Sequence, residues 1–576
     1  MNSNTKTGEL LWIYPPENKE WQAQIVKEFS IHPITAQVLV SRGFSSLDQI
    51  HSYLYGQLPD LIDPYLFADM DKAVDRVCSA IQKGEGILIY GDNDVDGMTG
   101  TALLTDFLTY IGASVFYYVP NRTSLRQSLI IDALNYAKQN HCKLLITVDC
   151  GITAAKEIEQ VVEQGVDVIV TDHHEPTDKI PHTLATLNPK LLINSYPNRH
   201  LTGVGVAFKL AHALTNHLAS KKNTRKIDLK RYLDLVALGT IADMGSLLGE
   251  NRILVRYGLK QLRKTRRIGL TKLFTICGLD TGDITAADVA SKIAPRLNSL
   301  GRIADPRKGI ELLLIRDDKA AEALAKELDL YNIERQKIDQ TVSDDVDRYI
   351  KANPEILNDK AIVLSSDKWH PGVIAIVTTR ISKQYNRPTI IIAIENGVGK
   401  GSARTIREFP LLPSLKSTSD ILINFGGHDF AAGLTIKEDQ IEEFKKRFKE
   451  SANATLQGDD MLTKLNLDAK ADFNELTFDL MESLALLEPY GNENPAPVLY
   501  CDATQAWPPK VISKSHLKLY LEQERMLEGV GFGMADKAPF LRRRNLPLSV
   551  AFTPHINRFQ NKISIQLLIR DFKIKS

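Results

Sequence analysis

Four short apolar runs in the first third of the chain constrain its fold more than any other feature. They span residues 87–90, 115–119, 144–148 and 166–170. Each run has the length of a buried strand, and the segments 99–111 and 154–163 between them have helical periodicity. Alternation of this kind is typical of a parallel sheet covered by helices on both faces. The sequence therefore predicts an α/β core built on a parallel sheet.

Polar clusters follow three of these runs, and a fourth cluster ends a later helical segment. They are Asp92-Asn93-Asp94-Val95-Asp96-Gly97, Val148-Asp149-Cys150-Gly151, Thr171-Asp172-His173-His174 and Ile241-Ala242-Asp243. Functional groups of open parallel sheets collect beyond the carboxyl ends of the strands. Carboxylates with some imidazole suit Mn²⁺ or Mg²⁺ better than structural zinc. So many carboxylates can hold two ions, and a two-ion site of this kind most often cuts phosphate esters.

Other interpretations of these residues fit the sequence less well. The segment 92–97 matches the opening of an EF-hand loop, but that motif requires a glutamate six residues after the glycine, and position 103 is Leu. A polar turn with solvated acids would explain one cluster, but not several clusters that each follow a strand. For Cys150, a small buried thiol is favoured over a metal ligand.

Length, charge and cysteine content narrow the class of protein. The 576 residues are too many for one hydrophobic core, and we expect two to four domains. A formal net charge of +1 excludes a globally basic surface, so any contact with nucleic acid must be local. The five cysteines form no C-x-x-C pair and fit reduced thiols. With no secretory signal and no apolar run near the ~20 residues of a membrane span, we expect a cytoplasmic protein that binds no membrane.

The chain is expected to divide into five segments. Residues 317–352 are heavily charged and contain neither Gly nor Pro, which indicates a long solvated helix. A second α/β unit begins near residue 361, and short strands after residue 460 are consistent with a small OB-type barrel. The expected segments are an N-terminal lead-in (1–70), a catalytic core (71–315), a connecting helix (316–355), a substrate-binding α/β domain (356–455) and a nucleic-acid-binding barrel (456–576).

Two glycine-rich segments of the second α/β unit carry donors for an anion. Lys400 and Arg404 stand beside Ser402, and Gly427 precedes His428. Such cations, hydroxyls and amides suit a phosphate oxygen. A turn and a structural histidine are the alternative interpretations of these segments. In the last segment, the run Arg542-Arg543-Arg544 is more often a solvated turn than a DNA contact.

The four polar clusters, in this order, resemble the motifs of the DHH phosphoesterase superfamily, named for the triplet Asp172-His173-His174. Further segments resemble its later motifs and the OB-fold of its single-strand-specific 5′→3′ DNA exonucleases: residues 238–252, 295–302, 369–374, 426–433 and 487–495. The resemblance covers most of the chain. It implies a parallel-sheet DHH core, a long connecting helix, a second α/β DHH-associated domain and a C-terminal OB-like β-barrel.

The resemblance also implies roles for individual residues. The expected metal ligands are Asp92, Asp94, Asp96, Asp149, His173 and Asp243; all but Asp92, together with His174, are the expected catalytic residues. The expected substrate-binding residues are Arg122, Asn298, Arg302, Ser402, Arg404 and His428. Ser402, Arg404 and Arg122 are expected to receive a 5′-terminal phosphate. Asp172 is expected to orient an imidazole.

One loop departs from the pattern of these exonucleases. After Pro120-Asn121-Arg122 they usually continue to a Gly-Tyr-Gly, whereas this chain continues with Thr123-Ser124-Leu125-Arg126-Gln127. The loop that helps to seat the DNA end is therefore expected to differ. The 5′-phosphate requirement and the role of Arg122 stay open.

Residues and resemblance together predict a metal-dependent 5′→3′ exonuclease that hydrolyses single-stranded DNA to mononucleotides in DNA repair and recombination. Two Mn²⁺ or Mg²⁺ ions are the expected cofactors. Single-stranded DNA and a helicase or single-strand-binding protein are the expected partners. A narrow cleft between the α/β domains would admit one strand and exclude duplex. Two alternatives stay open: a DHH phosphodiesterase acting on short oligoribonucleotides or cyclic dinucleotides, and a non-catalytic DNA-binding scaffold of the same fold.

Overall fold

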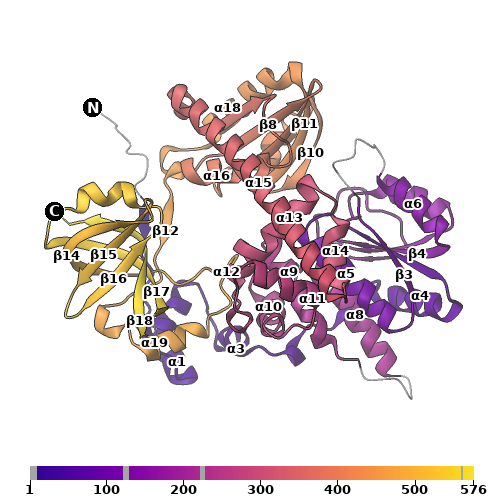
Figure 1. Cartoon of the computed structure of the whole chain (residues 1–576), viewed down its shortest axis with the longest axis horizontal. Helices are drawn as coiled ribbons and strands as arrows, with labels where there is room; N and C mark the ends of the chain where they lie inside the picture. Colours follow the sequence, from indigo (N-terminus) through magenta and orange to yellow (C-terminus); the bar gives the residue numbers. More distant parts are fainter. Residues whose placement is uncertain (1–9, 121–128, 221–226, 560–561, 576) are drawn as a thin grey trace. The chain divides into compact units, whose positions relative to one another are not determined.

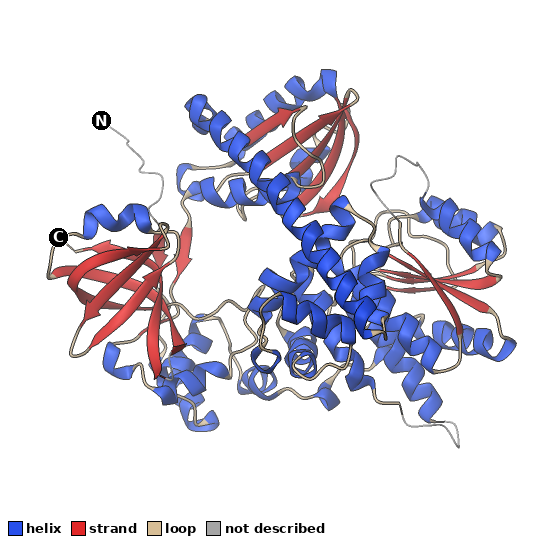
Figure 2. Cartoon of the chain, in the orientation of Figure 1, coloured by secondary structure: helices blue, strands red, loops and turns tan. Residues whose placement is uncertain are grey.

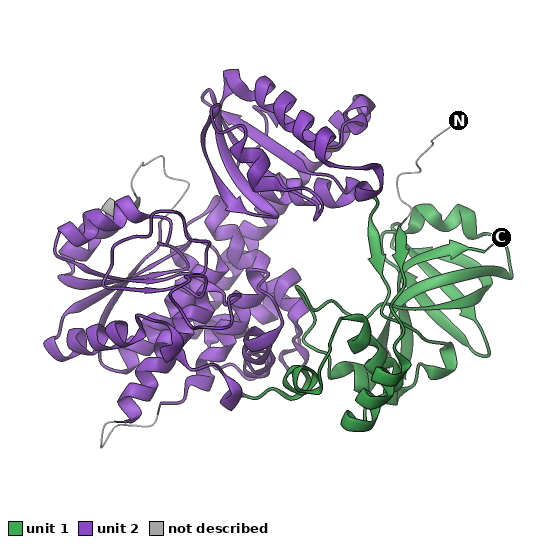
Figure 3. Cartoon of the chain, turned by 180° about the vertical axis from the view of Figure 1, so that it is seen from behind, with its two compact units in different colours: residues 1–57, 462–576 green, residues 58–461 purple. Residues whose placement is uncertain are grey.

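The computed structural model describes residues 10–120, 129–220, 227–559 and 562–575. The chain forms two compact units (Figure 3). One unit is Leu58–Met461, and the other combines Met1–Gln57 with Leu462–Ser576. The residues up to Gln57, expected to belong to a separate lead-in, thus share a unit with the C-terminal strands.

The first sheet of the larger unit is parallel throughout, which confirms the predicted α/β core. Its strand order is β3-β2-β4-β5-β6, and all neighbouring strands are parallel. The strands are β2 (Gly86–Gly91), β3 (Ser114–Tyr118), β4 (Cys142–Val148), β5 (Asp167–Thr171) and β6 (Ala185–Leu187). The three-residue strand β6 is too short to be recognised from periodicity.

Helices cover both faces of this sheet (Figures 1 and 2). They are α4 (Met70–Lys83), α5 (Val95–Tyr110), α6 (Leu129–Gln139), α7 (Ala155–Glu163) and α8 (Gly203–Ala219). Ile87 and Ile89 of β2 pack into one core with α4, α5 and α8. Leu88 and Tyr90 pack into a second core with α6 and α7. Both sets of alternate residues are therefore buried, which explains the uninterrupted apolar run of β2.

A helical section follows the sheet and leads into the connecting helix. Its helices are α9 (Leu233–Ala242), α10 (Gly249–Leu262), α11 (Ile268–Ile276), α12 (Ala286–Asp288), α13 (Ala294–Ile303) and α14 (Arg307–Leu314). The connecting helix α15 (Asp318–Ala352) is 35 residues long, and the side chain of Asp317 caps its first turn. It packs on α11 and α13 and, further along, on α16 (Ile374–Tyr385).

The second sheet of this unit is mixed, with the order β10-β11-β9-β8-β7. Its strands are β7 (Ile362–Ser366), β8 (Thr389–Glu395), β9 (Val398–Arg404), β10 (Leu422–His428) and β11 (Ala431–Lys437). Only β7 and β8 are parallel; the other neighbours are antiparallel. Helix α16 covers one face, and α17 (Leu411–Lys416) and α18 (Ile441–Thr455) cover the other. The glycine-rich residues 399–404 and 426–428 therefore lie in strands β9 and β10, not in turns.

The glycines of β9 fit the packing of this sheet. A Cβ at Gly399 would lie 2.7 Å from Cγ2 of Ile392, and one at Gly401 would lie 2.7 Å from Cδ1 of Leu434. Neighbouring apolar side chains therefore fill the space beside these glycines. This close packing explains why a strand carries a sequence that reads like a turn.

The smaller unit contains a closed five-stranded barrel, which confirms the predicted OB-like module. The barrel order is β14-β15-β16-β18-β17, and β17 closes onto β14. Its strands are β14 (Leu499–Ile512), β15 (His516–Glu522), β16 (Met526–Gly531), β17 (Leu546–Phe559) and β18 (Lys562–Ile574). The short strand β13 (Ala469–Lys470) adds to β14.

N-terminal residues complete this unit. Its helices are α1 (Lys19–Phe29), α2 (Pro33–Ser41), α3 (Leu47–Tyr55) and α19 (Phe478–Ala485). Strand β1 (Leu11–Ile13) pairs in parallel with β12 (Lys464–Asn466). Trp12 donates its indole N–H to the buried Asp571 at 2.8 Å. Among the residues that the structure describes, no helix in either unit combines the length and apolar character of a membrane span.

Candidate metal centre and phosphate-binding residues

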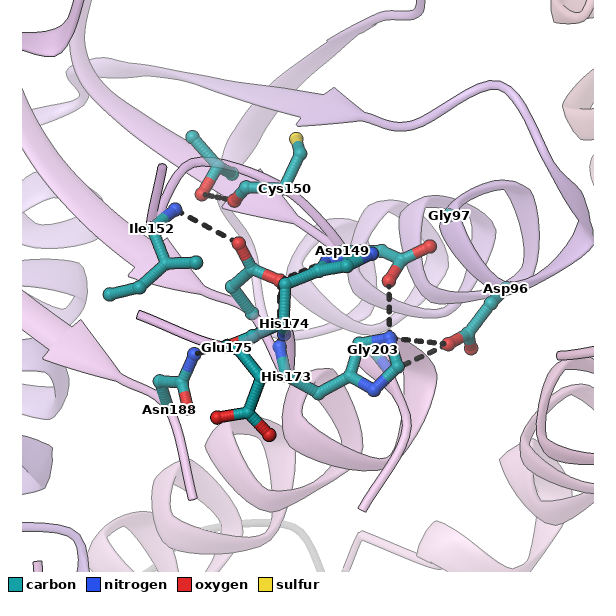
Figure 4. Close-up of polar contacts among 12 residues, drawn as sticks. Asp96, Gly97, Asp149, Cys150, Ile152, His173, His174, Glu175, Asn188 and Gly203 are labelled. Atoms are coloured by element: carbon teal, nitrogen blue, oxygen red, sulfur yellow. Dashed lines mark hydrogen bonds and ion pairs between the residues drawn. The ribbon is translucent and has the colours of Figure 1, made fainter. Parts of the chain in front are cut away.

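The predicted metal residues come from separate segments that meet at one edge of the first sheet. Asp92 and Asp94 follow β2, and Asp96 lies in the first turn of α5. Asp149 follows β4, His173 follows β5, and Asp243 follows the last residue of α9. Because parallel strands end at the same edge, side chains from distant parts of the sequence lie together, as Figure 4 shows for Asp96, Asp149 and His173.

Three overlapping groups of these side chains have the spacing of metal sites. The groups are Asp92, Asp94 and Asp149; Asp149, His173 and His174; and Asp96, His173 and Asp243. Within each group, one possible ligand atom of every residue lies within 4.8 Å of the others. Asp149 and His173 each belong to two groups. This overlap fits two neighbouring ions that share ligands.

His173 joins two of these groups, because its ring lies close to three of the acids. Its Nε2 lies 3.0 Å from Oδ1 of Asp149, 3.7 Å from Oδ2 of Asp243 and 3.9 Å from Oδ2 of Asp96. Burial, with the charge of the neighbouring His174, lowers the pKa of His173 to about 3. The ring is therefore neutral at physiological pH, which is the form that binds a metal.

The acids at this edge have too little positive charge around them. Burial and then the nearby carboxylate of Asp94 raise the pKa of Asp96 to about 7. The same two causes, burial first and neighbouring carboxylates second, hold the pKa of Asp149 and of Asp243 well above the ordinary value. A bound divalent cation would supply the missing charge.

The carboxylate of Asp96 is held by a helix terminus that is distant in sequence. The backbone N–H of Gly203 donates to its Oδ2 at 2.6 Å, and that of Val204 donates to its Oδ1 at 2.8 Å (Figure 4). Both amides belong to the first turn of α8. A Cβ at Gly203 would lie 2.5 Å from Cβ of Asp149, so glycine is required there. No sequence pattern around Gly203 indicates this contact.

Asp172 orients the second histidine of the triplet, as the resemblance implies. Its Oδ1 lies 2.7 Å from Nδ1 of His174, and its Oδ2 accepts the backbone N–H of Ile152 at 2.9 Å. Burial lowers the pKa of His174, but the hydrogen bond to Asp172 and the charges of Asp172, Asp92 and Asp243 together outweigh burial and raise the pKa to about 9. At neutral pH, His174 is thus a cation beside the acids, whereas His173 is neutral.

The predicted substrate-binding residues lie on α13 and on the second sheet. Asn298 accepts the backbone N–H of Val95 at 3.2 Å, which joins α13 to the first acidic motif. The ring of His428, at the end of β10, stacks on His174 with centroids 5.7 Å apart. The second sheet thereby reaches the DHH triplet.

Two arginines accompany these contacts. Arg302 donates to the carbonyl of Gly372 at 3.1 Å, and Arg404 donates to Oγ of Ser402 at 3.2 Å. Burial and then the charge of Arg302 lower the pKa of Arg404, which indicates that the two guanidinium groups are close. Arg122 and residues 123–128 lie outside the described residues, so their predicted role stays a prediction.

Two further sequence features can be placed. The Cys150 thiol lies 3.4 Å from the carbonyl of Val148 and belongs to none of the candidate metal groups found among the described residues. The arginines at 542–544 are exposed, as expected of a solvated turn. One of them, Arg544, lies 4.6 Å from the ring centre of the half-exposed Trp507 on the barrel.

The parallel core with an Asp-His-His triplet at its strand ends, followed by a helix and a mixed second sheet, defines a phosphoesterase of the DHH class. Family models agree: the DHH family N-terminal domain matches residues 86–240, the DHHA1 domain matches 358–454, and the RecJ OB domain matches 467–571. Curated relatives named RecJ are 31–35% identical over nearly the full chain. The chain belongs to the RecJ family.

Individual relatives show how far this similarity extends. The single-stranded-DNA-specific exonuclease RecJ of Bacillus subtilis is 35% identical over 98% of this chain and 71% of its own length. That of Escherichia coli is 31% identical over 93% of this chain and 95% of its own length. The crystal structure of Thermus thermophilus RecJ with Mn²⁺ has a TM-score of 0.83 at 29% identity, covering 98% of this chain and 80% of that one. The corresponding Mg²⁺ complex has a TM-score of 0.77 at 27% identity, over 98% and 79%.

Proposed function

We propose that the protein is a metal-dependent exonuclease that removes mononucleotides from the 5′ end of single-stranded DNA, in DNA repair and recombination. One observation carries the proposal: an intact set of acids and imidazoles, sharing Asp149 and His173, lies at the strand ends of a RecJ-family chain. Relatives that match 93–98% of this chain carry the name of this activity. The OB barrel supplies a module that suits a single strand, through stacking and backbone charge.

The acids and His173 would hold two Mn²⁺ or Mg²⁺ ions. The residues that would do so are Asp92, Asp94, Asp96, Asp149, His173 and Asp243. When bound, such ions activate water and neutralise charge on the scissile phosphate. Gly203 and Val204 keep the Asp96 carboxylate in place through their amides. No side-chain nucleophile is needed at such a site.

The remaining residues would handle the substrate. We propose that His174, as a cation oriented by Asp172, contacts or protonates a phosphate-bound oxygen. Asn298, Arg302 and His428 would face the phosphate backbone near the metals. Ser402 and Arg404 would receive the 5′-terminal phosphate, because a hydroxyl and a guanidinium stand together on β9. The part that Arg122 takes in this stays a prediction.

A time course on defined single strands tests the proposal. The substrates are 5′-phosphorylated, 5′-hydroxyl and 3′-blocked strands of the same sequence, each with Mn²⁺ or Mg²⁺ and with EDTA. We expect mononucleotides from the 5′ end, unaffected by the 3′ block and absent with EDTA. Intact 5′-phosphorylated strands after incubation with either metal would overturn the proposal.

The two alternative functions have less support. A phosphodiesterase for oligoribonucleotides or cyclic dinucleotides does not explain the RecJ OB domain at 467–571, and comparing rates on a dinucleotide and on long DNA separates the two. A silent scaffold does not explain why every predicted acid of the metal site is present. Strand binding without metal-dependent cleavage would support the scaffold. The cytoplasmic location and a helicase or single-strand-binding partner stay predictions.

A further inference from the structure

Three half-buried arginines gather where the two α/β domains and the connecting helix meet. Arg302 ends α13, Arg404 ends β9, and Arg335 lies in the middle of α15. Burial and then the charge of Arg335 lower the pKa of Arg302, and burial and then Arg302 lower that of Arg404. Helix α13 packs on α15, and Arg302 is close enough to repel both Arg335 and Arg404. Two of them are expected substrate contacts, but no role is assigned to Arg335.

Arg335 has little to balance its charge. Its side chain is only 11% exposed, and its one close polar contact within the described part of the chain is Nη2 to Oδ1 of Asn332, at 2.9 Å. The carboxylate of Asp339 stays 4.0 Å from Nη1, and burial raises the pKa of that carboxyl. The Nε of Arg335 is buried and has no hydrogen-bond partner among the described residues.

A neighbouring arginine shows what a structural pair looks like on the same helix. Arg380 of α16 binds Asp347 of α15 through two hydrogen bonds, both of 3.1 Å. The surface of α15 therefore offers a carboxylate where a guanidinium only has to join two helices. No such bidentate partner faces Arg335, Arg302 or Arg404 among the described residues, since their close contacts are carbonyl, amide and hydroxyl oxygens.

Two carboxylates, Asp94 and Asp339, raise the pKa of Arg302, and Asp94 is itself an expected metal ligand. A ligand with at least two negative charges would therefore balance the remaining positive charge of the three guanidinium groups. A DNA end offers this charge in its terminal phosphate and the next phosphodiester. We propose that Arg335 is a further phosphate-binding residue, which contacts a backbone phosphate of the single strand beside Arg302. This inference rests on the proposed function, and it adds the connecting helix to the substrate-binding surface.

The alternative is that Arg335 only fastens α15 through Asn332, which is itself buried. Salt dependence separates the two roles. Each phosphate contact with single-stranded DNA contributes about 0.7 to the slope of log affinity against log salt concentration. A purely structural arginine contributes nothing to that slope.

The experiment compares the full-length wild type with Arg335→Met, Arg335→Lys and the control Arg348→Met. Arg348 lies on the same helix, but its side chain is 74% exposed and pairs with Asp345. The measurements are kcat and KM on a 5′-phosphorylated single strand with Mn²⁺, at several salt concentrations, and the melting temperature. For Arg335→Met we expect KM to rise by about 10- to 100-fold. We also expect a salt slope smaller by about 0.7.

The remaining outcomes decide the matter. Arg335→Lys should restore the salt slope but only part of the KM, because lysine lacks the planar fork of donors. The control should match the wild type in both quantities. An unchanged salt slope in Arg335→Met would overturn the inference, and so would a salt slope in Arg335→Lys that stays below that of the wild type. If the wild type itself does not cleave, it is the proposed function that fails.

Discussion

Both α/β domains of the larger unit consist of a sheet covered by helices, but the charged groups gathered at the two sheets have opposite sign. At the edge of the first sheet, burial and mutual repulsion raise the pKa of Asp96, Asp149 and Asp243. At the second sheet, burial and neighbouring cations lower the pKa of Arg404 and His428. The acids at the edge of the first sheet therefore outnumber the cations beside them, whereas cations are in excess around Arg404 and His428. A phosphate bound between metal ions and arginines would balance the charge at both sheets. The two domains are therefore suited to bind one substrate from two sides.

The sheets place these groups in different ways. In the parallel sheet, Asp149 and His173 stand just past strand ends. In the mixed sheet, Ser402 lies within β9 and pairs in register with Gly433 of β11. A side chain inside a strand has fixed neighbours, and the adjacent glycine leaves its surroundings open. The acidic half is thus built from loops on a rigid edge, and the basic half from a strand surface.

Among the changes predicted for the two domains, Asp149→Asn should have the largest effect on activity, because it removes an acid from the metal site. Because metal ions supply several kcal/mol of transition-state stabilisation, we expect kcat/KM on single-stranded DNA to fall by about 10³-fold or more. Asparagine tolerates the left-handed backbone at this position, where φ is +62°. Without metal, the melting temperature should rise, because a buried carboxylate without a cation is removed.

The control for this variant is Glu163→Gln, which neutralises an exposed acid at the end of α7. It should change neither activity nor melting temperature measurably. Activity of Asp149→Asn within tenfold of the wild type would contradict the central position of Asp149. A lower melting temperature of the metal-free variant would contradict the charge argument.

Arg404→Met tests the basic half. A charge-assisted hydrogen bond to the terminal phosphate would be lost, so KM on a 5′-phosphorylated strand should rise by about 10- to 100-fold. On a 5′-hydroxyl strand the change should be much smaller. Arg407→Met removes an exposed arginine three residues on and serves as the control. Equal losses on both strands would show that Arg404 does not bind the terminal phosphate.

Much of the acidic half could be predicted from the sequence. Asp149 and His173 follow apolar runs whose period and length indicate strands, and parallel strands bring such positions together. Their order and the later motifs then gave the family. The different protonation of His173 and His174 could not be predicted, because it depends on how Asp172 is held by Ile152 and on burial.

Contacts that join distant segments could also not be predicted from the sequence. The amide of Gly203 binds Asp96 across 107 positions, and Trp12 binds Asp571 across 559. No periodicity encodes such a pairing. Strand β9 could not be predicted for another reason. Its glycines leave room for side chains of neighbouring strands, but a segment so rich in glycine has the composition of a turn. Packing, not local propensity, decides these regions.

The pH dependence of stability tests the contrast between the two domains further, with a smaller expected effect than the loss of activity. Without metal, the folded chain holds a proton on Asp96 up to about pH 7, against an ordinary pKa of 3.8. The folded state therefore binds more protons than the unfolded state between these values, and its stability should fall as the pH rises through them. The low pKa of His173, about 3, opposes this fall up to about pH 6.5. Differential scanning calorimetry between pH 5 and 8 should therefore show the fall most clearly above pH 6.5, and Mn²⁺ should reverse it.

Asp96→Asn provides the matched comparison for this measurement. The high pKa of His174, about 9, causes a loss of stability above pH 6.5 in both proteins. Because the charge of His174 also lowers the pKa of Asp96, the difference between the two proteins reports Asp96 together with its interaction with His174. The metal-free variant should gain several degrees over the wild type at pH 8 and less at pH 5. A constant gap across this range would mean that Asp96 keeps an ordinary pKa.

Cys150→Ser should have the smallest effect, although it lies beside Asp149. The thiol contacts the carbonyls of Val148 and Tyr90, at 3.4 and 3.8 Å, and not the candidate ligand atoms. A serine hydroxyl can donate to the same carbonyls, so we expect kcat to change by less than about threefold. The Mn²⁺ concentration for half-maximal activity should also stay the same. A clear rise in that concentration would place a thiolate among the ligands. The metal site of the first domain would then not consist of carboxylates and imidazole alone, and its contrast with the cationic residues of the second domain would need another explanation.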